Sequence, residues 1–239
     1  MKRFITGLLA TAFAAGIAYA EETRVSLGYE TVDQEDDTIS GKEESSGNGW
    51  YLLGEGDKGD LVYRLSYRDL SLELDDNSRK FDYSVTDAYF GWHGWYLGEA
   101  VGFGPVFNHI MVKSDNMGES DRTVAGLMMR SESDQIDWTL SLGAIVNSDT
   151  FDSGLAFSVG ADMHVSQAVT LTGGWNRTQA EYKGGEDATI DVFDLGARYR
   201  FADIFFVEGG LQLANGTSDE LAGADTSSTT FSLGVGTTF

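Results

Sequence analysis

The chain has 239 residues and a formal net charge of −22, from 16 Lys and Arg against 38 Asp and Glu. This balance excludes nucleic acid as a partner, because phosphate binding needs clustered Lys and Arg. There is no cysteine, so an exported form must be held by core packing or by backbone pairing rather than by disulfides. Plentiful Tyr, Phe and Trp with a single proline suit long, continuously paired strands.

The first 20 residues have the pattern of a secretory signal peptide. Lys2 and Arg3 give a positive start, an apolar run follows, and Ala18-Tyr19-Ala20 is a small-x-small cleavage sequence. The apolar run is too short to cross a bilayer as a helix, which needs about 20 apolar residues. We therefore expect cleavage after residues 1–20, leaving one domain over residues 21–239.

Alternation of apolar and polar residues, typical of strands with one wet and one apolar face, recurs about twelve times along the chain. In the clearest example, Leu61, Tyr63, Leu65 and Tyr67 alternate with polar or small residues. The expected strands, in chain order, are residues 22–31, 50–56, 61–68, 83–96, 101–112, 123–129, 136–146, 155–163, 169–175, 193–201, 205–213 and 227–239.

Two of these strands are less regular than the others. Residues 50–56 have no clean phase, and in residues 101–112 the phase shifts near Pro105. We expect a bulge there, because proline cannot donate to the ladder. An arrangement of ten strands therefore stays open beside twelve.

The connections alternate in length and charge. Short turns are expected at residues 57–60, 97–100, 130–134, 164–167 and 202–203. The intervening connections are longer, polar and acidic; the first, residues 33–47, is too charged to be buried, so we expect a long external loop. Aromatic residues gather beside both sets of connections: Tyr96, Tyr199, Phe201, Phe205 and Phe239 near the short turns, and Tyr29, Tyr67 and Trp175 near the long ones.

The chain ends on an amphipathic strand with an aromatic last residue, and Phe231, Leu233, Val235 and Phe239 share its apolar face. Together with strands of about 9–11 residues and alternating short and long connections, this ending resembles bacterial outer-membrane β-barrel proteins of small, porin-like size. A terminal strand of a soluble β-sandwich is the alternative, but a sandwich gives no reason for the alternation of connections.

The resemblance implies an all-β, transmembrane, antiparallel up-and-down barrel in the cell outer membrane. It also implies partners: outer-membrane lipid and lipopolysaccharide around the wall, and the barrel-assembly machinery, for which Phe239 is the C-terminal signal. Aromatic residues at two levels fit the two girdles of such a barrel.

In a barrel, the polar face of each strand lines the lumen. Charged residues of both signs fall on that face in about equal numbers, and Arg198 lies nearly opposite Glu208 across a short turn, where the two can pair. The candidate lumen-lining residues are Arg24, Glu30, Glu55, Arg64, Arg68, Asp87, His93, Arg130, Asp137, Asp162, Asp194, Arg198, Arg200 and Glu208.

Two functions are compatible with this face. Fixed luminal charges make a selective pore for passive diffusion of small solutes, with a mild preference for cations from the acidic external loops. Alternatively, ion pairs close the lumen, and the barrel is a structural, adhesion or surface-interaction protein acting through those loops. About 8 strands give a filled barrel and 16–18 a clear channel, so twelve leaves both open.

The size and strand number also resemble small monomeric porins for acidic oligosaccharides, whose lumens are strongly basic. The lumen predicted here is mixed in sign, which puts that solute class in doubt. Arg64 and Arg68, one above the other on a strand face, are the part that fits such a basic track. Ion pairing in the lumen is the alternative explanation, and it is the one we favour for these two arginines.

We expect neither catalytic residues nor a metal or cofactor. Some outer-membrane barrels are lipases or deacylases with a His-x-Ser pair, and His164-Val165-Ser166 has this spacing. However, it falls in a short turn with no acid or Asn suitably placed. The three histidines fall on separate elements, and the acidic residues 33–37 lack the spacing of a dedicated calcium loop.

Overall fold

A computed structural model describes the chain except for residues 1–21, 39–40, 75–79, 99, 116–117 and 219–223. The signal peptide predicted at residues 1–20 lies outside the described residues. Within the described part the chain is all β, and no helix there is long and apolar enough to cross a membrane.

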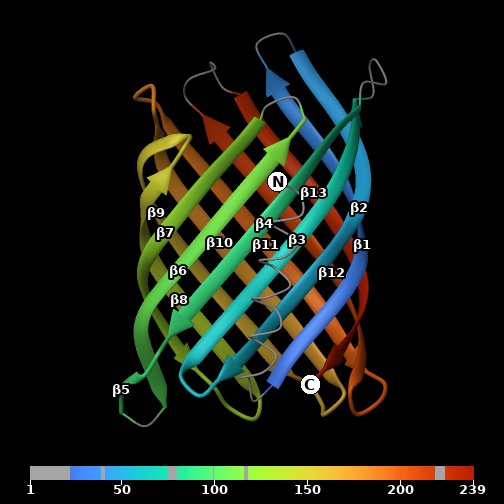
Figure 1. Ribbon diagram of the computed structural model, residues 1–239, viewed down its shortest axis with the longest axis vertical. Helices are drawn as coiled ribbons and strands as arrows, with labels where there is room; N and C mark the ends of the chain where they lie inside the picture. Colours follow the sequence, from blue (N-terminus) through green and yellow to red (C-terminus); the bar gives the residue numbers. More distant parts are fainter. Residues whose placement is uncertain (1–21, 39–40, 75–79, 99, 116–117, 219–223) are drawn as a thin grey trace.

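The described strands are long and follow one another closely (Figure 1). They are β1 (Glu22–Thr38), β2 (Gly41–Lys58), β3 (Leu61–Leu74), β4 (Lys80–Trp92), β5 (Trp95–Leu97), β6 (Val101–Ser114), β7 (Gly118–Ser131), β8 (Ile136–Ser148), β9 (Phe151–His164), β10 (Val169–Tyr182), β11 (Asp187–Arg200), β12 (Phe205–Ser218) and β13 (Ala224–Thr238).

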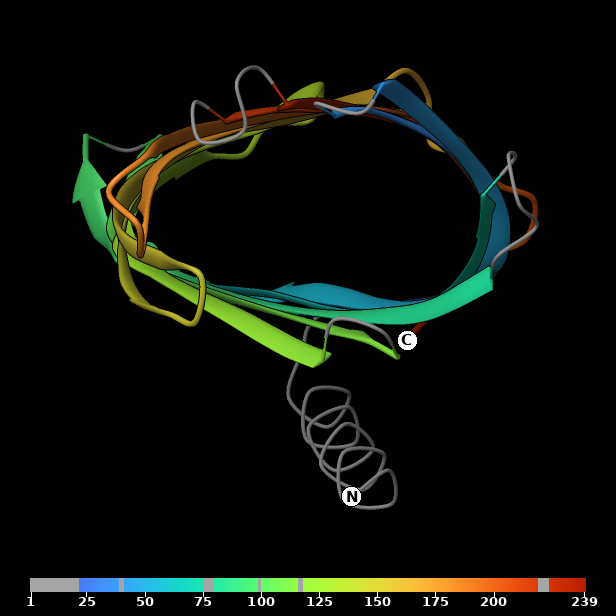
Figure 2. The ribbon, with the colours of Figure 1, turned by 90° about the horizontal axis from the view of Figure 1, so that it is seen from above.

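All neighbouring strands are antiparallel, and the sheet closes on itself. The order is β4-β3-β2-β1-β13-β12-β11-β10-β9-β8-β7-β6, and a ladder between β4 and β6 completes the ring, which Figure 2 shows from above as an oval. The short β5 pairs with β6 beyond the end of the β4 ladder, so it continues β4 in the same place in the wall. The barrel therefore has twelve strands, as predicted, and the ten-stranded alternative is wrong.

The irregularity predicted at Pro105 lies in the partner strand instead. β6 pairs with β7 without a shift of register through Pro105. On its other side, the ladder with β4 ends at Gly91↔Val106 and resumes in β5 at Trp95↔Phe103. The extra residue is thus taken up around His93, next to a proline that has no N–H to offer the ladder.

The turns at the rim that holds Phe239 agree with the prediction. The two residues Gly59 and Asp60 join β2 to β3, and Gly59 has a φ of +54°, which glycine adopts without strain. Gly98, with a φ of +72°, serves the turn after β5. We call this rim the lower rim, as in Figure 1. Both ends of the barrel chain meet there, because Arg24 pairs with Thr238.

The long acidic loop predicted at residues 33–47 is wrong, whereas residues 75–79 and 219–223 of two other predicted loops lie outside the described residues. β1 continues to Thr38 and β2 begins at Gly41, so most of the acidic residues 33–47 pair as a hairpin. Every strand that reaches the upper rim was predicted too short there. The backbone stays hydrogen-bonded while the charged side chains, such as Lys42 with Glu35, remain in water.

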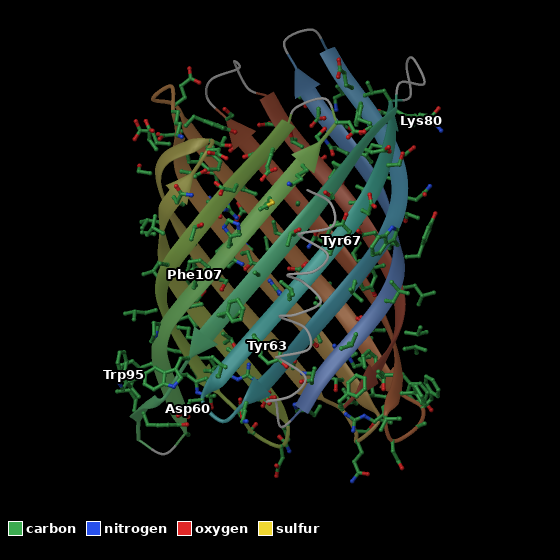
Figure 3. All side chains as sticks on the ribbon, in the orientation of Figure 1. Asp60, Tyr63, Tyr67, Lys80, Trp95 and Phe107 are labelled. Carbon is green, nitrogen blue, oxygen red and sulfur yellow. The ribbon has the colours of Figure 1, made fainter. Side chains whose placement is uncertain are left out.

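The outer face of the lower half is apolar. Leu27, Leu195 and Leu233 are more than half exposed, as a lipid-facing side chain is. Aromatic residues bound this band on both sides: Tyr96, Tyr199 and Phe205 near the lower rim, and Tyr29, Trp50 and Tyr67 above it. Trp50 and Tyr67 contact one another across β2 and β3, with ring centroids 5.3 Å apart. Figure 3 shows Tyr63, Tyr67 and Phe107 on the outside of the wall.

Above this upper aromatic level, the two faces exchange character. We call this part the upper half. Its outer face carries polar residues such as Asp69, Ser71 and Glu73 on β3, while the intervening Leu70 and Leu72 are buried inside. Two separate apolar clusters line its interior: Val32, Leu70 and Leu72 with Phe81 and Tyr83, and Phe151, Ala180 and Ala188 with Ile145, Tyr182 and Ile190.

Candidate functional site: the polar belt of the lumen

Contacts between strands that are not neighbours identify the inner face. Arg198 on β11 reaches Glu55 on β2 although three strands lie between them, and Arg68 on β3 reaches Gln212 on β12. Such contacts can only cross the inside of the barrel. Because side chains alternate along each strand and the register is continuous, these residues define which face of their strands is luminal.

The first group of luminal charges is centred on Arg198. Its Nη2 donates to Glu55 Oε1 at 2.7 Å and to Glu208 Oε2 at 3.2 Å, so the predicted pairing with Glu208 is confirmed. Arg24 Nε lies 3.5 Å from the same oxygen of Glu55, and the Tyr51 hydroxyl donates to Glu208 at 3.3 Å. One guanidinium therefore joins β2, β11 and β12.

A second group crosses the lumen just above the first. Arg68 lies 3.9 Å from Glu30 and donates to Gln212 Oε1 at 3.3 Å. The amide nitrogen of Gln212 donates in turn to Asp194 at 2.7 Å, and Asn176 also approaches Asp194, at 3.5 Å. Glu30 is 2% exposed, the most deeply buried of the predicted luminal acids.

The third group lies on β3, β4 and β6. Arg64 Nη2 donates to Asp87 at 2.9 Å, and the guanidinium lies 5.9 Å from the centre of the Tyr89 ring. Asn108 donates to the other oxygen of Asp87 at 2.6 Å. We call these three groups together the polar belt. Within it Arg64 and Arg68 are ion-paired, so they do not form a basic track.

The remaining candidates lie at or below the belt. Arg130 reaches Asp57 at 3.4 Å, and Asp137 lies 3.0 Å from His164 Nε2. Asp162 pairs across the ladder with Asp137, on the same inner face. His93 and Arg200 lie at the lower end: His93 is 5% exposed against the Gly102 backbone, and Arg200 is the last residue of β11.

The belt differs from a closed salt-bridge core in its contact with water. The side chain of Arg64 points inward yet is 50% exposed, and that of Arg68 is 35% exposed. An inward side chain can be this accessible only if it borders space wide enough for water. Fully buried pairs pay a large desolvation cost, whereas these charges keep part of their hydration.

The His-x-Ser triplet has its side chains engaged separately. The expectation that no acid is placed near this histidine is wrong, because the His164 ring lies 3.0 Å from Asp137; it also lies 3.4 Å from Thr170. The Ser166 hydroxyl oxygen accepts from the backbone N–H groups of Ala168 and Val169 at 3.2 and 3.1 Å. This serine shapes the turn between β9 and β10.

Sequence reasoning missed several luminal residues. Tyr51, Gln212 and Asn108 connect the charges of the belt, but the prediction considered only ionisable groups. Arg122 was also missed; it lies on the inner face of β7, where it pairs with Ile110 on β6 and with Ser148 on β8. The signal was present, because Arg122 shares the alternation of Arg130, which was predicted correctly to lie on this face.

Comparison with known proteins gives the fold. No family model matches the chain, and no curated protein matches it in sequence. Among solved structures, the COG4313 outer membrane channel from Pseudomonas putida F1 matches with 11% identity over 92% of this chain and 96% of that chain, at a TM-score of 0.58. The translocator domain of autotransporter NalP from Neisseria meningitidis matches with 13% identity over 99% and 95%, at a TM-score of 0.53. The chain thus has the fold of an outer-membrane β-barrel.

Proposed function

We propose that this barrel is an outer-membrane channel for the passive diffusion of small polar solutes, with a mild preference for cations. The observation that carries the proposal is the water contact of inward-facing charges, above all the half-exposed Arg64. Charges of both signs along a hydrated lumen are the usual means by which barrels select solutes. The similarity to an outer-membrane channel of known structure is in keeping with this.

The cation preference rests on luminal carboxylates without a basic partner. Asp194 is held by the neutral amides of Gln212 and Asn176. Asp162 has no ion pair with any described residue. In contrast, each arginine of the polar belt has a carboxylate within 4.0 Å. The belt therefore has surplus negative charge, which attracts small cations.

Cross-lumen bonds favour a second candidate, a barrel with a closed lumen that acts through its acidic upper half. The bonds from Arg198 to Glu55 and from Arg68 to Gln212 span the interior and narrow it. In this reading the upper hairpins, with their exposed acidic side chains, are an adhesion or interaction surface.

The proposal includes the surroundings of the barrel. Residues 1–20 direct export and are removed, the apolar outer band contacts lipid and lipopolysaccharide, and Phe239 is presented to the assembly machinery. His164 and Ser166 take no catalytic part, and no metal or cofactor is needed for diffusion.

Planar-bilayer recording of the refolded protein under a salt gradient separates the two candidates. We expect discrete conductance steps and a reversal potential that favours cations. The double variant Asp162→Asn, Asp194→Asn should move that potential towards zero, while Asp82→Asn on the outer face of β4 should leave it unchanged. Silence from protein shown by heat-modifiable gel mobility to be folded would exclude the channel and leave the closed barrel.

A further inference from the structure

A small cavity of about 210 Å³ lies on the inner face of β6, β7 and β8 in the upper half. Its apolar wall is formed by Ile110, Val112 and Phe151. Arg122 projects beside Ile110, its cross-strand neighbour, and reaches Thr178 on β10 with two strands between. The Arg122 side chain therefore lies inside the barrel and borders the cavity.

Arg122 differs from the arginines of the polar belt and from Arg130, because no carboxylate of the described residues lies within 4.0 Å of its guanidinium. The arginines at positions 24, 64, 68, 130 and 198 each lie within 4.0 Å of a carboxylate. Among the described residues, the hydrogen bond found for the Arg122 guanidinium goes to the neutral hydroxyl of Thr178, at 3.3 Å. A guanidinium has five N–H donors, so most of its donors are left for a ligand.

The other polar groups of the cavity are already satisfied by one another. The Ser120 and Thr150 hydroxyls lie 2.8 Å apart, and Ser148 Oγ donates to the Asp121 carbonyl at 3.1 Å. Ser148 Oγ also accepts from the backbone N–H of Phe151 at 3.2 Å. Asp121 contributes to the lining, but no ion pair joins it to Arg122. The Arg122 guanidinium is therefore the group of this cavity that has donors available, and an anion is the ligand that would accept from them.

We propose that this cavity binds a small organic carboxylate with an apolar body, such as an aromatic or short aliphatic acid. The planar fork of arginine matches a carboxylate in two parallel hydrogen bonds. Ile110, Val112 and Phe151 supply the apolar contact that free inorganic anions cannot use. The cavity is smaller than the roughly 300–1,000 Å³ of sites for drug-sized ligands, which limits the ligand to a small molecule.

This inference goes beyond the proposed function, because it gives a lumen that favours cations a separate binding site for an anion, and the binding step does not depend on conduction. In a lumen with surplus negative charge, an anion is retained only where an unpaired arginine and apolar contacts act together. The site lies above the polar belt, in the half of the barrel that Figure 1 shows away from the C-terminus. It is thus placed to meet a solute before the belt does.

Ligand-observed NMR on the refolded protein in detergent tests the site with benzoate as the probe. Benzamide has the same shape without the charge, and acetate has the charge without the ring. We expect each to bind at least about tenfold more weakly than benzoate, the factor that one charge-assisted hydrogen bond supplies. Equal binding of benzoate and benzamide would overturn the proposal.

Variants connect the binding to Arg122. Arg122→Gln should weaken benzoate binding about tenfold or more, whereas Arg177→Gln, on the outer face and paired with Asp191 at 3.8 Å, should not change it. Ile110→Glu places an internal carboxylate opposite Arg122 and should abolish binding, so it serves if Arg122→Gln does not fold.

The failure of this proposal differs from the failure of the channel. Folded protein that conducts but binds benzoate no better than the Arg122 variant refutes the site and leaves the channel. Folded protein that binds benzoate but never conducts supports the site and refutes the channel.

Discussion

Replacing Arg198 by methionine removes the centre of the largest luminal ion-pair group. The variant loses three hydrogen bonds, one to Glu55 at 2.7 Å and two to Glu208 at 3.3 and 3.2 Å. The guanidinium also lies 5.0 Å from the centre of the Phe206 ring. Methionine keeps the contact with this ring but provides no donor for either carboxylate.

The loss of stability in the Arg198→Met variant depends on which partners Glu55 and Glu208 keep. Breaking a fully buried pair by removing one partner costs about 3–5 kcal/mol. Here Glu55 keeps Arg24 at 3.5 Å, Glu208 keeps the Tyr51 hydroxyl at 3.3 Å, and their side chains stay 25% and 13% exposed. Water and these partners compensate part of the loss, so we expect a decrease of about 2–3 kcal/mol in the free energy of unfolding.

Equilibrium urea unfolding in lipid vesicles, followed by tryptophan fluorescence, measures this decrease. The matched control is Arg177→Met, which removes an outer-face pair with Asp191 and should cost less than about 1 kcal/mol. Adding Glu208→Gln to the Arg198 variant should recover part of the loss, because it removes the uncompensated charge. A cost for Arg198→Met no greater than that of the control would refute the assigned role.

Two further predictions concern the outer face and the last residue. Leu233→Arg, at a position 70% exposed in the apolar band, should cost about 2–4 kcal/mol in vesicles, whereas Ser71→Arg in the polar upper half should cost about 0–1 kcal/mol; equal costs would contradict the assigned lipid level. Phe239→Ala should lower the amount of folded barrel in cells severalfold. The unfolding free energy of the purified variant should change by less than about 1 kcal/mol, because Phe239 pairs with Thr23 through its backbone at 2.9 Å and its side chain is exposed. A matching loss in the purified protein would show a packing role instead of an assembly signal.

Barrel architecture was predictable because the lower half of each strand faces lipid on one side and water on the other. Apolar and polar residues therefore alternate strictly along segments such as residues 61–68. Tight turns such as Gly59-Asp60 indicate where one strand ends and the next begins. The lower rim and the antiparallel order follow from these local patterns, which left the strand number open between ten and twelve.

The upper ends of the strands were predicted too short for a physical reason. On β3, Tyr67 is the last outer-face aromatic residue, after which Asp69, Ser71 and Glu73 face water while Leu70 and Leu72 turn inward. The alternation persists, but its apolar phase moves to the other face. A prediction based on the outer apolar face alone therefore ends the strand at that point and assigns the following residues to a loop.

The sequence predicts which residues lie on the luminal face, but it does not predict which of them contact one another across the lumen. Alternation places Arg198 and Glu208 on the same face, and their short turn brings them together. In contrast, the contact between Arg198 and Glu55 depends on the curvature of the closed wall, which no local pattern contains. The distance of Arg122 from the carboxylates of the described residues is likewise a property of the whole interior.

The exchange of faces along the strands means that the molecule needs two different environments to fold. The lower half has an apolar cluster inside, formed by Val62, Val106 and Met128 with Tyr89, but its outer band is apolar as well and depends on lipid around it. The upper half, with polar residues outside and the two apolar clusters inside, is patterned like a small water-soluble barrel. Its hairpins, including β1 with β2, stand above the bilayer as paired strands. In the described residues, the upper rim therefore carries its exposed acidic side chains on hydrogen-bonded strands rather than on loops.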